Sequence, residues 1–304
     1  MRPRGGRRGP GDRCEDITGS GRKAAHRPSP GRIRPARPLD AARDAQFPDY
    51  GGLSSEHGLG RFSMTPTLVP HHPARDWAEI QERMLVPLYE AVYDHLGVGA
   101  GTRLLGLGCG SGLALLMAAA RGARVAGADR DHARVALARE RLPEGVTVTE
   151  EPPEDLPYDV ITAFHATNGM LPGLRSLTRS AQPGAAVVLA GWGPSERCAT
   201  EPVLRVAARL ADRAPAPGPD LDAMVAGAGL RPVGSGRVAC PFGYAGEASA
   251  VRGLLSTGAF DAAVRATDLS QVEKEIEEAL APYVRPDGTV WMPNVFRYVV
   301  ARVA

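Results

Sequence analysis

Four glycines alternate with other residues where an apolar run gives way to helix-forming residues, in 103-RLLGLGCGSGLALL-116. These are Gly106, Gly108, Gly110 and Gly112. A glycine turn that opens a helix lets a ligand approach the backbone closely, and the free N–H groups of the helix terminus favour an anionic or polar group there. The segment therefore predicts a cofactor-binding loop between a strand and a helix.

The spacing of the glycines separates the common kinds of glycine loop. A dinucleotide fingerprint needs G-x-G-x-x-G or A, and counting from Gly106 or Gly108 does not give it. A P-loop needs G-K-S/T, which does not occur in the chain. The string that fits is G-x-G-x-G, which ends at Gly112. Asp129 follows Gly108 by 21 residues, at the end of the next predicted strand. A carboxylate there can accept hydrogen bonds from the ribose hydroxyls of a nucleoside.

A third group of candidates follows the predicted strand within 158-YDVITAFHA-166. Sites in open α/β sheets lie beyond the carboxyl ends of the strands, so His165 is a candidate base or substrate contact, with a structural histidine as the alternative. Phe164 is a candidate cofactor contact or a core aromatic residue. Cys109 lies inside the glycine loop without a neighbouring His or Lys and is interpreted as a tolerated small side chain. Trp192 could line an apolar pocket or belong to the core.

Alternating strands and helices must position these residues. Apolar runs predict strands at 103–108, 123–129, 145–150, 158–166, 185–192, 231–240 and 294–303. Helical periodicity appears at 75–99, 112–121, 131–142, 171–181, 221–230 and 247–281. Pro87 should split the first of these helices. The pattern is typical of a doubly wound α/β fold, whose mostly parallel sheet has helices on both faces.

The charge of the chain is unevenly distributed. Residues 1–63 hold 13 Lys and Arg against 7 Asp and Glu, whereas residues 64–304 hold 23 against 27. The leader 1–63 lacks apolar periodicity, and we expect it to be disordered. It could be a nucleic-acid-binding arm or a transit peptide, but a segment without a folded role is favoured. In one form of that hypothesis, translation begins at Met64. Residues 64–304 then form the folded domain.

Composition also excludes several kinds of protein. No run approaches the ~18–20 uncharged apolar residues that span a bilayer, and no apolar signal core lies in the first 30 residues. The cysteines are far apart in the sequence and show no metal-ligand spacing: Cys14, Cys109, Cys198 and Cys240. We therefore expect no metal site, no disulfide scaffold, no membrane association and a cytoplasmic location.

Taken together, these features resemble the class I S-adenosylmethionine-dependent methyltransferases. The resemblance covers about residues 75–304 and is strongest at 103-RLLGLGCGSG-112 and 123-ARVAGADRD-131. The N-terminal helices and residues 159–166, 252–260 and 285–303 resemble small-molecule methyltransferases of bacterial secondary metabolism. The resemblance implies a Rossmann-like, seven-stranded sheet with an antiparallel C-terminal strand. It also implies S-adenosylmethionine as cofactor, a small-molecule methyl acceptor, and helices 75–98 and 247–281 as a substrate cover.

The same resemblance assigns roles to individual residues. It implies that the loop Gly108, Cys109, Gly110 and Gly112 holds the methionine part of the cofactor. Asp129 would hold the ribose and Arg130 would flank the adenine. The place of Phe164 and His165 at the end of a predicted strand gives the other two roles: Phe164 would pack on the cofactor, and His165 would be the catalytic residue if the acceptor must lose a proton.

Two positions depart from the family pattern. Gly106 stands where the family usually has an acid that helps to hold the cofactor's amino group, and losing one charge-assisted hydrogen bond costs roughly 1.5–3 kcal/mol. The acid near the adenine has no clear match, with Glu150, Glu151 and Glu154 as candidates. A binding module without catalysis therefore stays an alternative, as does a nicotinamide-dependent oxidoreductase, which the glycine spacing disfavours.

A nucleic-acid acceptor is not expected. Residues 64–304 are acidic, and the D/N-P-P-Y/F string of amino-methylating DNA enzymes is absent. A homodimer is compatible with the sequence, which does not decide between oxygen, nitrogen and carbon as the acceptor atom.

Overall fold

The computed structural model describes residues 72–153, 157–214 and 218–304, apart from the side chains of Asn168, Arg179 and Ser180. They all belong to one compact unit, Thr65–Ala304. The predicted leader 1–63, the start at Met64 and the candidate Glu154 lie outside the described residues.

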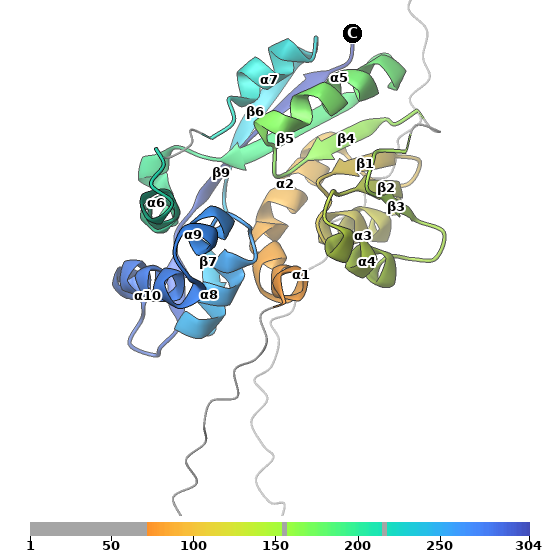
Figure 1. Cartoon of the computed structure of the whole chain (residues 1–304). Coiled ribbons are helices and arrows are strands. Elements are labelled where there is room, and N and C mark those ends of the chain that lie inside the picture. Colours follow the sequence, from red (N-terminus) through yellow and green to blue (C-terminus); the bar gives the residue numbers. More distant parts are fainter. Residues whose placement is uncertain (1–71, 154–156, 215–217) are drawn as a thin grey trace, which may run out of the picture. The chain divides into compact units, whose positions relative to one another are not determined.

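Within these residues, seven strands form one sheet in the order β3-β2-β1-β4-β5-β9-β6 (Figure 1). The strands are β1 (Arg103–Leu107), β2 (Arg124–Ala128), β3 (Thr147–Thr149), β4 (Val160–Ala163), β5 (Ala186–Trp192), β6 (Arg231–Ala239) and β9 (Val295–Arg302). Strands β1 to β5 are parallel, and β9 runs antiparallel to β5 and β6. The predicted doubly wound sheet with an antiparallel C-terminal strand is confirmed.

Helices cover both faces of this sheet, as its apolar strands require. One face carries α2 (Val86–Leu96), α3 (Leu113–Ala120) and α4 (His132–Arg141), and the other carries α5 (Leu171–Ser180) and α7 (Leu221–Gly227). Successive residues of a strand point to opposite faces. Thus Val188 packs with the α2 group and Leu189 with the α5 group.

The remaining elements gather beside the carboxyl end of β5 and around α1 (Figure 1). Before the sheet come α1 (Pro73–Asp76), the π-helical turn η1 (Trp77–Gln81) and the 3₁₀ turn η2 (Glu82–Leu85). After β5 come η4 (Ser195–Arg197), α6 (Glu201–Leu210), β7 (Phe242–Tyr244), α8 (Glu247–Leu255), α9 (Asp261–Ala266), α10 (Leu269–Leu280), η5 (Ala281–Tyr283) and β8 (Val290–Met292).

The N-terminal helical region is split as predicted, because α2 begins at Val86 with Pro87 as its second residue. Proline is tolerated in a first turn, where its missing N–H has no helical partner to bond. Helix α6 and the β7–β8 pair were not predicted, although Val203, Val206 and Ala207 have the spacing of an amphipathic helix. Throughout the described ranges, no helix has the length and apolar character needed to cross a membrane.

Candidate functional site

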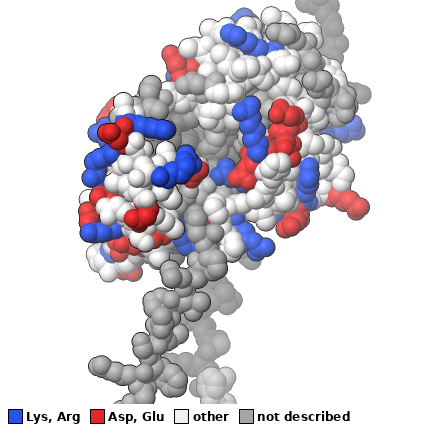
Figure 2. All heavy atoms as spheres, viewed as in Figure 1, with Lys and Arg blue, Asp and Glu red and all other residues white. Residues whose placement is uncertain are grey.

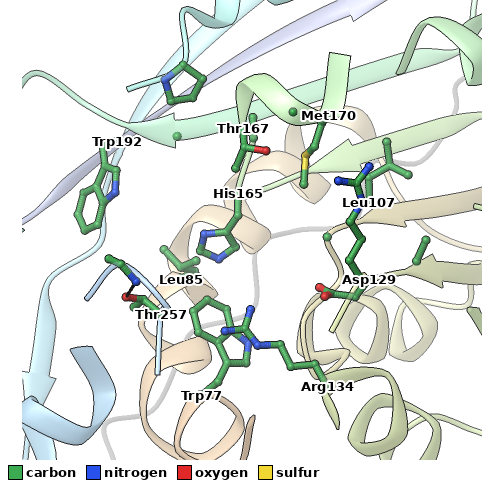
Figure 3. A pocket seen from close by; sticks show the side chains of 18 of the residues that line it. Trp77, Leu85, Leu107, Asp129, Arg134, His165, Thr167, Met170, Trp192 and Thr257 are labelled. Atoms are coloured by element: carbon green, nitrogen blue, oxygen red, sulfur yellow. Dashed lines mark hydrogen bonds between the residues drawn. The ribbon is translucent and has the colours of Figure 1, made fainter. Parts of the chain in front are cut away.

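The carboxyl ends of β2, β1, β4 and β5 lie next to one another in the sheet and open into a cavity of about 700 Å³. This strand order brings together residues that are far apart in the sequence. Gly108, Asp129, His165 and Trp192 each follow or end one of these strands, and all four line the cavity. In Figure 3, Asp129 lies on one side and Trp192 on the other, with His165 between them.

The glycine loop is as close-packed as its sequence suggests. Gly108 and Gly110 have φ angles of 61° and 58°, in the region that L side chains rarely adopt. A Cβ on Gly110 would lie 2.7 Å from Nε1 of Trp77 and 2.9 Å from Oε1 of Glu82. Gly112 is the N-cap residue of α3 and packs on α4 rather than lining the cavity. Gly110 therefore cannot carry a side chain without displacing the segment in front of it.

Asp129 joins the end of β2 to the glycine loop. Its carboxylate accepts hydrogen bonds from the backbone N–H groups of Gly110 (2.8 Å) and Asp131 (3.0 Å) while it lines the cavity. The exposed Arg130 lines the same end. Glu150 lies there too, with Oε1 at 2.8 Å from Nδ1 of His132. These charged residues mark one end of the cavity, which we call the cofactor end.

His165 occupies the middle of the cavity (Figure 3). Its ring meets that of Trp77 edge to face at 5.0 Å between centroids. Its Nε2 atom is buried and has no hydrogen-bond partner among the described residues. Burial and the positive charge of Arg134 lower the pKa of His165 from 6.5 to about 4. The imidazole is therefore neutral near pH 7.

Phe164 and Cys109 lie beneath the loop and do not reach the large cavity. They line a separate cavity of about 10 Å³. Phe164 packs against Tyr89 at 4.7 Å and Tyr93 at 5.9 Å, in the core. Burial raises the pKa of Cys109 to about 12, so its thiol stays protonated near neutral pH.

Two side chains of the N-terminal segment, Trp77 and Glu82, reach the loop and were not among the predicted site residues. The Glu82 carboxylate is 2% exposed and accepts hydrogen bonds from Ser111 Oγ (2.6 Å) and Arg141 Nη1 (2.8 Å). The guanidinium of Arg134 lies over the Trp77 ring at 4.4 Å. The cofactor end is thus closed by residues that precede the sheet in the chain.

The opposite end of the cavity, which we call the acceptor end, is apolar. Trp192 is 38% exposed, and its ring lies tilted against those of Phe296 (4.6 Å between centroids) and Phe242 (5.6 Å). Further apolar side chains there come from η2, α6 and α8: Leu85, Leu204 and Leu254. The charged side chains that the described residues give to this cavity all come from the segment after β2, from α4 and from the segment after β3. No group of three His, Cys, Asp or Glu residues in the described ranges could hold a metal ion.

A known family matches the parallel part of the sheet, which carries the glycine loop. Residues 105–189 match the family model described as a methyltransferase domain. The chain carries a class I methyltransferase domain. It is an S-adenosylmethionine-dependent methyltransferase, and S-adenosylmethionine is its cofactor. No curated protein sequence matches the chain.

Solved structures share the fold of this methyltransferase. A candidate type II methyltransferase from Anaeromyxobacter dehalogenans is 23% identical with a TM-score of 0.50, over 70% of this chain and 95% of that one. An S-adenosylmethionine-dependent methyltransferase from Aquifex aeolicus is 18% identical with a TM-score of 0.44, over 77% and 99%. A candidate methyltransferase from Bacillus halodurans is 13% identical with a TM-score of 0.46, over 70% and 97%.

The residues of the cofactor end fit S-adenosylmethionine, a nucleoside joined to an amino-acid tail through a methylated sulfur. Gly108 presents bare backbone to the cavity, where a Cβ would lie 2.8 Å from Cε of Met170. The Asp129 carboxylate lies at the rim, where ribose hydroxyls could donate to it. The buried Nε1 of Trp77 has no partner among the described residues and offers a further hydrogen-bond donor.

Proposed function

We propose that this methyltransferase methylates an uncharged, largely apolar small molecule, in keeping with its resemblance to enzymes of bacterial secondary metabolism. The observation that carries the proposal is the lining of the acceptor end by Trp192, Phe242, Phe296 and leucine side chains. A charged acceptor would lose its hydration there without gaining a partner of opposite charge, which costs several kcal/mol. An apolar ring system would instead be stabilised by aromatic contacts.

The cofactor would be held by Gly108 to Gly112, by Asp129 at the ribose and by Arg130 beside the adenine. When bound, S-adenosylmethionine supplies a methyl group that is already activated on a sulfonium. The protein then has to hold an acceptor nucleophile in line and exclude water. The cover formed by α1, η1 and α8 suits both tasks, because it encloses the middle of the cavity.

His165 would contact the acceptor nucleophile. An imidazole with a pKa of about 4 is too weak a base to ionise a hydroxyl before transfer. It can accept a hydrogen bond from the acceptor in the tautomer that leaves Nε2 unprotonated. It can take the proton as positive charge develops on the acceptor atom, when that proton becomes strongly acidic. His165 would therefore orient the nucleophile first and accept its proton late.

A nucleic-acid acceptor has less support. Positive and negative side chains are interspersed on the face shown in Figure 2, whereas phosphate backbones are bound by surfaces with an excess of positive charge. The cofactor end itself mixes Asp129, Glu150 and Glu151 with Arg130 and Arg134.

Methyl transfer from labelled S-adenosylmethionine to matched pairs of acceptors tests the proposal. Each pair contains an uncharged fused-ring phenol or amine and the same compound with a carboxylate on the distal ring. We expect kcat/KM to be on the order of a hundred-fold higher for the uncharged member. Trp192→Ala should raise KM for the acceptor and leave cofactor affinity unchanged, and His165→Gln should lower kcat. Preferred methylation of the carboxylated compounds or of nucleic acid would refute the proposal.

A further inference from the structure

Two buried polar atoms of the N-terminal segment lie directly over the glycine loop. Nε1 of Trp77 and Oε1 of Glu82 would come within 2.7 and 2.9 Å of a Cβ on Gly110. Both residues line the small cavity beside the loop, together with Gly108 and His165. One atom is a hydrogen-bond donor and the other belongs to an anion, so together they complement the two charged ends of an amino acid.

The Trp77 indole is held firmly but its N–H is unused. The side chain is 4% exposed, between the Arg134 guanidinium over its face and the His165 ring at its edge. Nε1 has no hydrogen-bond partner in the described part of the chain. A buried donor without a partner is costly, and such groups usually bond a ligand or an ordered water.

The Glu82 carboxylate is anchored through one oxygen and leaves the other nearly free. Oε2 accepts from Ser111 Oγ and Arg141 Nη1 at 2.6 and 2.8 Å. Oε1 accepts only a long bond of 3.3 Å, from the backbone N–H of Leu113, among the contacts of the described residues. This oxygen is the one that faces Gly110, so it retains capacity for a cationic donor.

The position at which the family usually carries an acid for the cofactor's amino group is Gly106, and core side chains leave no room for an acid there. A Cβ on Gly106 would lie 3.0 Å from Cδ2 of Leu115 and 3.4 Å from Cβ of Cys109. These side chains belong to the core that α3 forms against the sheet. An acidic side chain at position 106 would therefore displace apolar packing, and the carboxylate must come from another element.

We propose that Trp77 Nε1 and Glu82 Oε1 bind the carboxylate and the ammonium group of the cofactor's amino-acid tail. The acid that related enzymes carry on the strand would here be carried by η2, on the covering segment. The neighbouring cavity holds only about 10 Å³, so η1 and η2 must shift outward to admit the tail. This inference rests on the cofactor and not on the proposed acceptor.

Binding of two nucleosides to the full-length protein tests the proposal. S-adenosylhomocysteine carries the amino-acid tail, and 5′-methylthioadenosine has the same nucleoside and sulfur without it. By titration calorimetry, Glu82→Gln and Trp77→Phe should each weaken S-adenosylhomocysteine binding about ten- to a hundred-fold. Both should leave 5′-methylthioadenosine affinity unchanged. Glu79→Gln, an exposed acid on the same segment, and Trp291→Phe are the matched controls.

The outcomes separate the possible roles of these residues. An equal loss of affinity for both nucleosides would mean that Glu82 only supports the start of α3, and it would overturn the proposal. Unchanged affinity for both would overturn it as well. If Glu82→Gln fails to fold, Trp77→Phe still decides, because it retains the ring and removes only the donor. Failure of the wild type to bind either nucleoside would refute the cofactor assignment itself, and failure of the acceptor assay alone would leave this inference standing.

Discussion

Substitution of Gly110 by alanine tests whether the N-terminal segment is built directly on the glycine loop. The backbone cost of alanine in a left-handed conformation is roughly 1–2 kcal/mol. Gly145 has a φ of 87° and no atom within 4 Å of the place where a Cβ would lie. Alanine at position 145 would therefore incur only this backbone cost. At Gly110 the Cβ also meets Trp77 Nε1 and Glu82 Oε1 at less than 3 Å. Displacing Glu82 breaks charge-assisted hydrogen bonds, at a further cost of roughly 1.5–3 kcal/mol.

We therefore expect Gly110→Ala to lower the free energy of unfolding by about 2.5–5 kcal/mol and Gly145→Ala by about 1–2 kcal/mol. Urea denaturation of both variants measures the difference, and titration with S-adenosylhomocysteine measures the site. Affinity should fall at least about ten-fold for Gly110→Ala and stay unchanged for Gly145→Ala. Equal destabilisation of the two variants, with cofactor affinity intact in both, would show that the N-terminal segment does not depend on its contact with Gly110. That result would refute the reasoning.

Three further predictions concern single carboxylates and the buried imidazole. Burial lowers the pKa of the His165 imidazole from about 6.5 in the unfolded chain to about 4 in the folded protein. The free energy of unfolding therefore keeps its full value above pH 6.5, and up to about 3 kcal/mol of it is lost as the pH falls towards 4. Urea denaturation between pH 7 and 4.5 should show this slope in the wild type and a shallower one in His165→Gln. Asp129→Ala should weaken S-adenosylhomocysteine binding at least about ten-fold, because the Gly110 N–H loses its acceptor, whereas Asp131→Ala should mainly lower stability by removing the cap of α4. Arg103 lowers the pKa of Asp159 through a hydrogen bond, so this pair stabilises the fold above the unfolded pKa of aspartate and less as the pH falls below it. Solvent screening limits the pair to about 1 kcal/mol, and Asp159→Asn should reduce stability at pH 7 by no more than that while cofactor affinity is unchanged.

The sequence predicted the cofactor end well because that end follows from local rules. Strand ends and a glycine turn are read from apolar runs and residue types, and parallel pairing then brings those ends together. Gly108, Asp129 and His165 accordingly line one cavity. The acceptor end was harder to predict, because Leu204 and Phe242 come from elements whose pairing with distant parts of the chain leaves no local signal.

Glu82 illustrates a different difficulty. In a regular α-helix, at 100° per residue, it would point about 140° away from Trp77, on the side expected to face solvent. The π-helical turn at Trp77–Gln81 and the 3₁₀ turn at Glu82–Leu85 change this phase. The segment also packs between the glycine loop and α8, so Asp76, Trp77, Gln81 and Glu82 are all buried. Periodicity alone cannot predict a helix that is buried on two sides and wound irregularly.

The division of the cavity between two stretches of chain has a consequence for how such an enzyme diversifies. The charged residues of the cofactor end precede Pro152, and most aromatic residues of the acceptor end come from β5 and the elements after it. Replacement of α6 and β7 could therefore alter the shape offered to the acceptor while the glycine loop and the covering elements α1, η1 and α8 stay unchanged. In chimaeras that exchange α6 and β7, the acceptor should change while the site that binds the methyl donor is retained.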